Sequence, residues 1–383
     1  MKILQQTLFF SLLLFMVGCA VDTIEPSLNQ EELKAQKHIK ASQEEMAAAE
    51  QEVKAFEQEW DQLKNTVTVP AGSVDALAAA IEQAGAGGTV ILASGSHTEN
   101  QPVIINKRVK IEGEDGASLL FPNVNEPMGI PKEIVPTIHV KDAERVWLNN
   151  FTLSTGSAEA SRYGIVIQNS DRTRIESLNI VGFQDGIFID GGDRCQIIRN
   201  NIVGVFDQFP ELVHWGITNS SGRRTVMFQN DISNFAVGIF FSDARGLAFS
   251  NTVEVSTPGG TIGIIWCTVP AWQAYPEGEF VSAAEPARGW RAYNNTCIGA
   301  LFNYLIIDGS NSAISIQNES IAAGLYDIEI AGESQRFGFV TPTSTNSLII
   351  SVGDNIDARI KDCTGDNTII GGSLVDTEVD PCF

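Results

Sequence analysis

Ionisable side chains in the middle of the chain have types that could support acid and base chemistry. Lys141 or His139 could act as a general base. Asp190 and Asp193 provide carboxylates that could act beside it, and Arg194 could stabilise negative charge. Each has an ordinary alternative, because the "DGGDRC" around Asp193 is also typical of a tight turn with solvated charges.

Aromatic and polar residues nearby could bind a sugar. Flat aromatic faces suit the apolar faces of sugar rings, while polar neighbours fix the orientation of the ring. The candidate ligand-binding residues are Phe188, Asp207, His214, Trp215, Phe240, Trp272 and Tyr275. The alternative is that the aromatic residues pack their loops against the main domain.

An internal repeat indicates the elements that position these residues. The segments "GIVIQNS", "GIFIDGG", "GITNSSG", "GIFFSDA" and "GIIWCTV" follow one another at spacings of 22, 30, 22 and 25 residues. They begin at Gly164, Gly186, Gly216, Gly238 and Gly263. A second pattern accompanies them, in "VWLNNFTL", "CQIIRNNI", "TVMFQNDI", "GLAFSNTV", "GWRAYNNT" and "AISIQNES".

The second pattern aligns asparagines in one column: Asn150, Asn200, Asn230, Asn251, Asn295 and Asn318. An apolar column lies two residues earlier: Leu148, Ile198, Phe228, Phe249, Tyr293 and Ile316. We expect both columns to face inward, with the amides hydrogen-bonded along the axis. One unit has Leu178 instead of asparagine, so the 50 residues from Asn150 to Asn200 span two units.

Each unit of roughly 22 residues contains three short strands and no helical pattern. We therefore predict that each strand pairs with its counterpart one coil later, giving parallel sheets wound as a solenoid of about ten coils. Alternation along a strand sends Ile187 and Ile189 inward, and Phe188 and Asp190 outward. An ordinary two-layer α/β domain would need helical patterns between the strands, and residues 88 to 321 have none.

These units resemble the right-handed parallel β-helix of the pectate-lyase-like superfamily. The segment "GGTVILASGSHTENQPVIINKRVKIEGEDGASLLF" is similar to the first coils of its NosD-like and polysaccharide-lyase-like members. The resemblance extends from about residue 73 to the C-terminus, most clearly over 87 to 321. It implies an all-β, single-stranded right-handed β-helix. The superfamily contains lyases, hydrolases, epimerases, adhesins and non-catalytic modules, so the fold does not settle the function.

The resemblance also implies a chemistry. Members that cleave acidic sugars use a lysine or arginine base beside carboxylates that hold calcium or neutralise the substrate, and related hydrolases use paired carboxylates. This sequence lacks the Asp-Pro-His-Asp element of mannuronan epimerases and the clustered aspartates of polygalacturonases. Their absence favours a binding protein over an enzyme. No cofactor is firmly indicated, although calcium remains an option.

Two departures from the period predict loops that leave the rod. They are "DQFPELVHW", residues 207–215, and "VPAWQAYPEGEFVSAAEPAR", residues 269–288. The two loops leave opposite edges of the sheet formed by the first strand of each coil. We therefore expect them to wall a groove across the outer face of that sheet.

The start of the chain is typical of a signal peptide. Lys2 gives a basic start, and Ile3 to Val17 is mostly apolar but too short to span a membrane. The following Gly18-Cys19 completes a motif similar to the lipobox of bacterial lipoproteins, whose cysteine is acylated. We expect residues 1–18 to be removed and Cys19 to anchor the protein in the bacterial cell envelope. The alternative is a plain secretory peptide cut elsewhere.

Residues 19–66 predict an anchor followed by a long helix rich in Glu, Gln, Lys and Ala. Its apolar residues follow a heptad pattern: Ile39, Met46, Ala49, Val53, Phe56, Trp60 and Leu63. This seam predicts either a coiled-coil stalk, through which residues 39–63 form a homo-oligomer, or a helix lying along the main domain. Residues 67–383 form the β-helix domain, beginning with a short capping helix for which Ser73 could be the N-cap.

Charge and cysteine content exclude several functions. The net charge is −22, and loss of Lys2 makes it −23, which disfavours nucleic-acid binding. An anionic polysaccharide would need a local basic patch or a bridging cation.

The cysteines and the four histidines lack zinc-site spacing, and phosphate-loop and GxSxG motifs are absent. Cys363 and Cys382 could form a disulfide, although free thiols are an alternative.

We therefore expect an exported, lipid-anchored bacterial protein whose β-helix binds a cell-envelope glycan in the loop-walled groove. One alternative is a polysaccharide lyase, epimerase or hydrolase acting on the same face. The other is a non-catalytic scaffold or adhesin.

Overall fold

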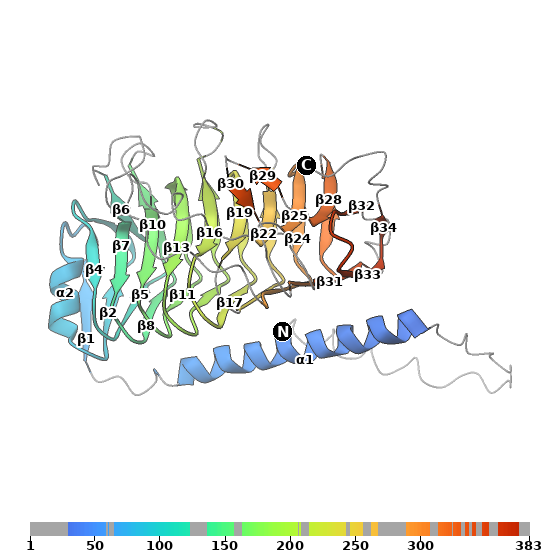
Figure 1. Cartoon of the computed structure of the whole chain (residues 1–383). Helices are drawn as coiled ribbons and strands as arrows, with labels where there is room; N and C mark the ends of the chain where they lie inside the picture. The colour runs from blue at the N-terminus through green and yellow to red at the C-terminus, as the bar shows by residue number, and fades with distance from the viewer. Residues whose placement is uncertain are drawn as a thin grey trace, which may run out of the picture.

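The computed structural model describes most of the chain. The described residues are 30–58, 60, 65–122, 136–156, 163–205, 207, 214–242, 246–255, 262–266, 289–306, 313–323, 325–330, 334–336, 339–341, 347–351 and 359–374. Within these residues the strands form three long parallel sheets wound into a rod (Figure 1). The expected β-helix is confirmed.

The first sheet has twelve strands and lies beside the long helix α1 (Gln30–Gln58). Its strands are, in order, β1 (Thr66–Val69), β2 (Gly88–Leu92), β5 (Val109–Gly113), β8 (Val146–Asn149), β11 (Arg174–Glu176), β14 (Gln196–Ile198), β17 (Thr225–Phe228), β20 (Gly246–Phe249), β23 (Arg291–Tyr293), β26 (Ile314–Ile316), β31 (Leu348–Ser351) and β33 (Thr368–Gly371).

The second sheet has eleven strands and contains the first repeat pattern. Its strands are β4 (Val103–Ile105), β7 (Pro136–Lys141), β10 (Tyr163–Gln168), β13 (Asp185–Asp190), β16 (Trp215–Asn219), β19 (Val237–Phe241), β22 (Ile262–Trp266), β25 (Phe302–Ile306), β28 (Tyr326–Ile330), β32 (Arg359–Asp362) and β34 (Ser373–Leu374).

The third sheet has nine strands: β3 (Gly95–Thr98), β6 (Ala117–Phe121), β9 (Thr152–Thr155), β12 (Asn179–Phe183), β15 (Asn201–Gly204), β18 (Asp231–Ser233), β21 (Thr252–Glu254), β24 (Thr296–Ile298) and β27 (Glu319–Ile321). A separate antiparallel hairpin joins β29 (Ser334–Arg336) to β30 (Phe339–Thr341). Beyond β27, the last described strands therefore continue only the first two sheets.

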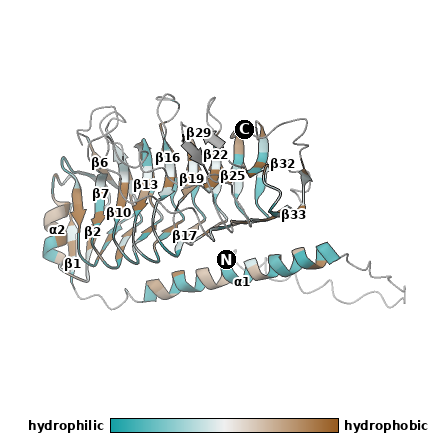
Figure 2. Cartoon of the chain, in the orientation of Figure 1, coloured by the Kyte–Doolittle hydropathy of each residue, from teal (hydrophilic) through white to brown (hydrophobic). Residues whose placement is uncertain are grey.

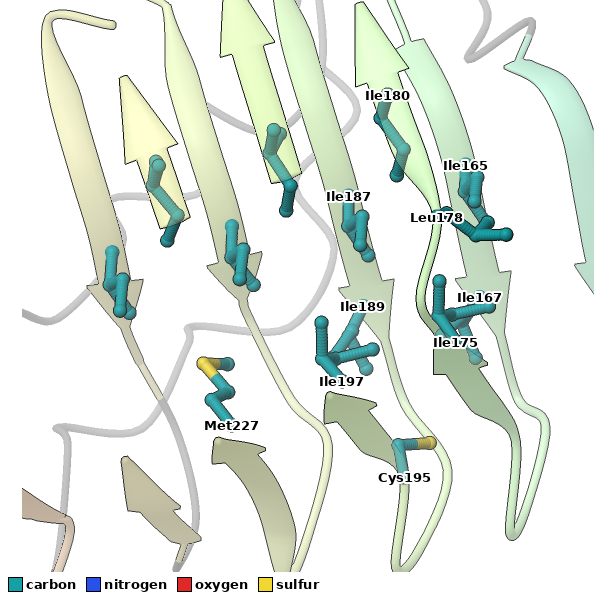
Figure 3. Close-up of a cluster of buried hydrophobic side chains, with 14 of the residues drawn as sticks. Ile165, Ile167, Ile175, Leu178, Ile180, Ile187, Ile189, Cys195, Ile197 and Met227 are labelled. Atoms are coloured by element: carbon teal, nitrogen blue, oxygen red, sulfur yellow. The ribbon is translucent and has the colours of Figure 1, made fainter. Parts of the chain in front are cut away.

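Stacked apolar side chains fill the interior of the rod. Ile187 and Ile189 of β13 face inward and are at most 1% exposed, as their alternation predicts. Figure 3 shows them beside isoleucines from neighbouring coils, such as Ile165 and Ile167 of β10. Each coil thus buries its apolar residues against the next coil, which is the main stabilising contribution in a solenoid.

The repeated glycine is required where successive coils approach closely. A Cβ atom on Gly164 would lie 2.7 Å from the carbonyl oxygen of Gly186, and one on Gly186 would lie 2.5 Å from that of Gly216. The same holds for Gly216 against Gly238, at 2.6 Å. The "GI" pattern therefore follows from the packing of coil against coil.

Buried asparagines form the expected ladder along the axis. The Nδ2 atoms of Asn200, Asn230, Asn251 and Asn295 each donate to Oδ1 of the next asparagine, at 2.9, 2.8, 2.8 and 2.9 Å, and Asn318 ends the ladder. Each Oδ1 also accepts from the backbone N–H of the preceding ladder residue, for example Asn230 to Asn251 at 3.0 Å. Leu178 occupies the missing position, and its N–H donates to Asn200 Oδ1 at 3.0 Å. The ladder satisfies buried backbone groups at each corner.

Two details of the predicted columns are wrong. Asn149, not Leu148, aligns through Glu176 with Ile198, so Asn150 lies one position before the ladder. The apolar column that contains Ile198 also faces outward rather than inward. The reason is the corner residue between the two columns, which has a left-handed backbone, as in Arg199 with φ of 53°. Because of this left-handed residue, the side chains on the two sides of the corner do not continue the inward and outward alternation of the strand.

The outward apolar column is covered by α1. Phe228 and Phe249 stack with ring centroids 4.3 Å apart, and the column is buried together with Ala35, Ala49 and Val53 of the helix. Figure 2 shows hydrophobic and hydrophilic residues mixed along α1. The heptad seam therefore faces the twelve-stranded sheet, which is the second of the two predicted arrangements. A homo-oligomer built on this seam would require α1 to leave the sheet.

Arg174 fastens the C-terminal end of α1. Its side chain is fully buried; Nη1 donates to the Val53 carbonyl at 2.8 Å, and Nη2 lies 2.7 Å from Glu57 Oε1. The same guanidinium pairs with Glu176 at 2.7 Å. A buried ion pair contributes little on its own, but breaking it is costly. These contacts fix the position of the helix along the sheet.

The short helix α2 (Leu77–Ala84) caps the first coil, as predicted. Leu77 and Ile81 belong to the interior core. Ser73 is not its N-cap, because the helix begins at Leu77 and its first N–H donates to Glu99 Oε1 at 2.8 Å. Burial raises the pKa of Glu99. No helix among the residues described above is long and apolar enough to cross a membrane.

We expect Asn251→Ala to lower the free energy of unfolding by about 2–4 kcal/mol, because the Met227 carbonyl and the Asn230 N–H lose buried partners. Urea unfolding measures this loss. Asn201→Ala is the matched control, because its amide bonds Asn179 at the surface, and its effect should stay below about 0.5 kcal/mol. Equal effects for the two variants would show that the ladder does not stabilise the rod.

Candidate functional site

The outer face of the eleven-stranded sheet presents one residue per coil in each column. The register places these residues in the central column: His139, Val166, Phe188, Thr218, Phe240, Ile265, Leu305, Glu329 and Lys361. A second outward column lies at the strand ends and contains Lys141, Gln168 and Asp190. The predicted outward positions are therefore correct.

Four polar side chains form a hydrogen-bonded row across successive coils. His139 Nε2 lies 3.2 Å from Gln168 Oε1, and Gln168 Nε2 donates to Asp190 Oδ2 at 3.3 Å. Ser221, in the turn after β16, donates to Asp190 Oδ1 at 3.3 Å. All four are half-buried. We call His139, Gln168, Asp190 and Ser221 the polar row.

The polar row fixes the tautomer of His139. An ionised Asp190 only accepts hydrogen bonds, so Gln168 must present its amide nitrogen to Asp190 and its oxygen to His139. His139 Nε2 therefore carries the proton in the neutral ring, which leaves the lone pair on Nδ1. Nδ1 is the atom through which this histidine could accept a proton.

The surroundings favour the neutral form of His139. Burial lowers its pKa, and the positive charge of Lys141 adds to this effect. The hydrogen bond to Gln168 and the charges of Asp142 and Asp190 act in the opposite direction. Because the folded pKa is lowered, the unfolded chain binds protons more readily, so the contribution of His139 to stability decreases as the pH falls below about 6.5.

Two predicted catalytic residues lie elsewhere. Asp193 pairs with Arg224, whose Nε donates to Asp193 Oδ1 at 2.7 Å. Arg194 lines a groove of about 420 Å³ between α1 and the twelve-stranded sheet, together with Glu45, Glu52 and Arg291. Asp193 and Arg194 therefore follow β13 around the corner and do not join the polar row. The turn interpretation of "DGGDRC" agrees with their contacts.

The predicted aromatic contacts are largely buried. Phe188 is 4% exposed and packs edge-on against Tyr163, with ring centroids 5.9 Å apart. Phe240 is 3% exposed and stacks on Trp215 at 4.8 Å. Phe188 and Phe240 therefore agree with the packing alternative, while Trp215 keeps a half-exposed side chain.

The first excursion contributes one surface carboxylate and one buried ring. Asp207 is exposed and accepts from Asn234 Nδ2 at 2.7 Å, whereas His214 is buried. Trp272, Tyr275 and Cys19 lie outside the described residues, as do residues 1–18 and most of the two loops that were expected to wall the groove.

Gln168 and Ser221 belong to the polar row but were not among the candidate site residues predicted from the sequence. Gln168 connects His139 to Asp190, and the available signal was its place in the same outward column as Lys141 and Asp190. Gln168 lies between His139 and Asp190, which are two coils, or about 10 Å, apart. His139 and Asp190 therefore do not form a directly bonded acid and base pair.

Metal ligands and thiols are not grouped near the polar row. Within the described part of the chain, no three His, Cys, Asp or Glu side chains lie together as a metal site would require. Cys195 and Cys297 are buried free thiols, and burial raises the pKa of each to about 12. Cys363 is disulfide-bonded.

Comparison with known proteins agrees with the fold. The family model described as "Right handed beta helix region" matches residues 137–259. An alginate lyase from Paenibacillus sp. str. FPU-7 is similar in structure, with a TM-score of 0.51 and 12% identity, over 80% of this chain and 97% of that chain. No curated protein matches the sequence.

Two further solved structures are similar to the chain. The Streptococcus pneumoniae surface protein and adhesin PfbA has a TM-score of 0.47 and 11% identity, over 81% of this chain and 97% of that chain. The gp42 tailspike of Acinetobacter phage vb_AbaP_AS12 has a TM-score of 0.48 and 11% identity, over 80% of this chain and 58% of the tailspike. At 12% identity, the alginate lyase shows a shared architecture and no shared activity.

The charges around His139 predict opposite effects of two substitutions. We expect Lys141→Gln to raise the pKa of His139, because it removes a positive charge that disfavours the imidazolium. We expect Asp190→Asn to lower that pKa, because it removes a negative charge that favours it. Proton NMR titration measures both, with the His139 signal assigned from its absence in His139→Gln. Lys40→Gln, at an exposed position of α1, should leave the pKa unchanged. Shifts of the same sign would contradict this account of the site.

Proposed function

We propose that this protein binds a polysaccharide that runs parallel to the rod axis along the polar row. The observation that carries the proposal is the hydrogen-bonded row itself, which crosses four successive coils on one face. A polymer aligned with the axis meets a related backbone at every coil. A small ligand would not need a site extended in this way.

The chemistry of the polar row suits sugar hydroxyls. The amide of Gln168, the carboxylate of Asp190 and the hydroxyl of Ser221 offer both donors and acceptors. Mutual hydrogen bonds already hold these side chains in place, so less conformational entropy is lost when a ligand binds. Lys141 is exposed beside the row. Trp215 and, in the second excursion, Trp272 and Tyr275 are proposed to stack on sugar rings.

The proposed location is the bacterial cell envelope. The apolar segment that ends before Cys19 supports export with removal of residues 1–18, and the lipobox-like motif supports lipid attachment at Cys19. A single anchored rod would then present the polar row to an envelope glycan. Calcium is proposed only as a bridge between Asp190 and an anionic sugar, because carboxylate oxygens are ligands for this ion.

Elimination on an acidic polysaccharide is the second candidate function. The observation that favours it is the neutral His139, whose Nδ1 lone pair could remove the proton from the carbon beside a sugar carboxylate. The C–O bond to the leaving sugar would then break, its oxygen would take a proton, and a carbon–carbon double bond would remain. Lys141 would neutralise the carboxylate.

Retention on a glycan array tests the binding proposal, using the full chain with and without calcium. We expect Gln168→Leu and Asp190→Asn each to weaken retention of the bound glycan by about tenfold, because each removes hydrogen bonds from the polar row. Asp231→Asn is the matched control, since Asp231 is exposed on the nine-stranded sheet. Retention that survives both row variants would place the binding site elsewhere.

The same samples separate a binding protein from an enzyme. A lyase would give product that absorbs ultraviolet light, and its rate would rise with pH through the lowered pKa of His139. His139→Ala would abolish the product, and it should weaken retention no more than Gln168→Leu does. Retention without product supports binding alone, whereas product that persists in His139→Ala excludes this histidine as the base.

A further inference from the structure

The groove between α1 and the twelve-stranded sheet has the dimensions of a ligand site. Its volume is about 420 Å³, which is within the range of small-molecule pockets. One wall is a single face of α1, from Glu45 to Glu52. The other wall consists of residues in or just before four successive strands, β14, β17, β20 and β23. We call this feature the helix groove.

The bottom of the helix groove is apolar. Ala49 of α1 and Val226 of β17 line it, and both belong to the buried cluster that joins the helix to the sheet. Leu247 of β20 packs against the same cluster and is half-buried. Gly246 adds no side chain to the lining, because a Cβ atom there would lie 2.0 Å from the ring of Trp290. The groove therefore has apolar surface that the side chain of a ligand can cover.

Most of the charged residues around this bottom are paired with one another. Glu45 pairs with Arg291 and accepts a hydrogen bond from Tyr293 Oη at 2.9 Å. Arg224 Nε donates to Asp193 Oδ1 at 2.7 Å. These charges already have partners in the protein, so they contribute less to the recognition of a ligand.

Glu52 and Arg194 are the incompletely paired charges of the helix groove. Glu52 is exposed on α1, and it forms no ion pair or hydrogen bond with the residues that the structure describes. Arg194 has a side chain that is 44% exposed and approaches Asp193 only to 3.8 Å. Because such an exposed contact is weak, the guanidinium of Arg194 can accept a further anionic partner.

These two charges are on different walls and at neighbouring coils. Glu52 is on the helix wall, close enough to Arg224, before β17, to act on its charge. Arg194 is on the sheet wall before β14, the strand adjacent to β17. Neighbouring strands are about 4.8 Å apart. A ligand whose positive and negative groups are close together can therefore contact both walls at once.

We propose that the helix groove binds an α-amino acid with an apolar side chain. Arg194 donates two parallel hydrogen bonds to the carboxylate of the ligand, and Glu52 pairs with its ammonium group. The apolar side chain covers Leu247 and Val226. Purely anionic ligands are disfavoured by Glu45 and Glu52, and purely cationic ligands by the arginines of the same groove. This site goes beyond the proposed function, because the polar row lies on the eleven-stranded sheet.

Methyl NMR of the full chain tests the site through the signals of Leu247, which are assigned from their absence in Leu247→Ile. The probes are leucine, leucinamide, which lacks the carboxylate, and N-acetylleucine, which lacks the ammonium group. We expect leucine to shift the Leu247 signals. Each analogue should bind about fivefold more weakly, because each loses one exposed ion pair. The methyl signals of Leu301, which is 39% exposed and outside the groove, should not move.

Two variants assign the charges of the ligand to their partners. Glu52→Gln should abolish the preference for leucine over N-acetylleucine and keep the preference over leucinamide. Arg194→Gln should have the reverse effect. Arg194 has a left-handed backbone, but glutamine already occupies such a corner at Gln229, so this variant should keep its unfolding midpoint. Glu50→Gln, at an exposed position of α1 outside the groove, should change neither preference.

Three results would overturn the amino-acid site. The first is the absence of any shift of the Leu247 signals at saturating leucine. The second is an equal shift of the Leu301 signals, which would indicate non-specific contact. The third is that both preferences persist in Glu52→Gln and Arg194→Gln, because neither residue would then contact the ligand.

Discussion

Every column of aligned side chains in this protein depends on the in-register stacking of parallel coils. The buried asparagine ladder and the interior apolar stacks hold each coil in the same rotation about the axis as its neighbour. The glycine column lets the coils approach closely enough for the backbone to pair. Because the register is shared, a residue at a given position in the repeat is automatically aligned with its equivalents along the rod. The polar row is one such alignment, and it would not exist if one coil slipped by a residue.

The same stacking also places an apolar column on the outer surface of the rod, where it needs a cover. A residue with a left-handed backbone follows each apolar residue from Ile198 to Ile316 on the twelve-stranded sheet and turns this column outward, where it would expose a long apolar stripe. Helix α1 covers this stripe with Ala35, Ala49 and Val53. Polar contacts fasten both parts of the helix: Glu45 accepts from Tyr293 at 2.9 Å, and Glu57 pairs with Arg174. The helix is therefore part of the domain rather than a separate stalk, and it leaves the outer face of the eleven-stranded sheet to the polar row.

Much of the fold could be predicted from the repeat, whereas the site could be predicted only in part. The spacing of the GI segments and of the asparagines was enough for the parallel sheets, the ladder and the substitution by Leu178. The orientation of the Ile198 column was not predictable from alternation, because alternation fails at a left-handed corner residue such as Arg199. Asn150 was placed one position too late because Asn149, not Leu148, aligns through Glu176 with Ile198. His139 and Asp190 were predicted as outward residues, but their connection through Gln168 depends on side-chain geometry.

The central claim is that a glycan lies parallel to the axis and contacts several coils through equivalent positions. A crystal structure of the full chain with an oligosaccharide of the retained glycan tests this claim most directly. The account predicts a sugar chain along β7, β10 and β13, with hydroxyl groups bonded to Gln168 and Asp190. An oligosaccharide bound across the strands, on the nine-stranded sheet, or in the groove beside α1 would contradict it.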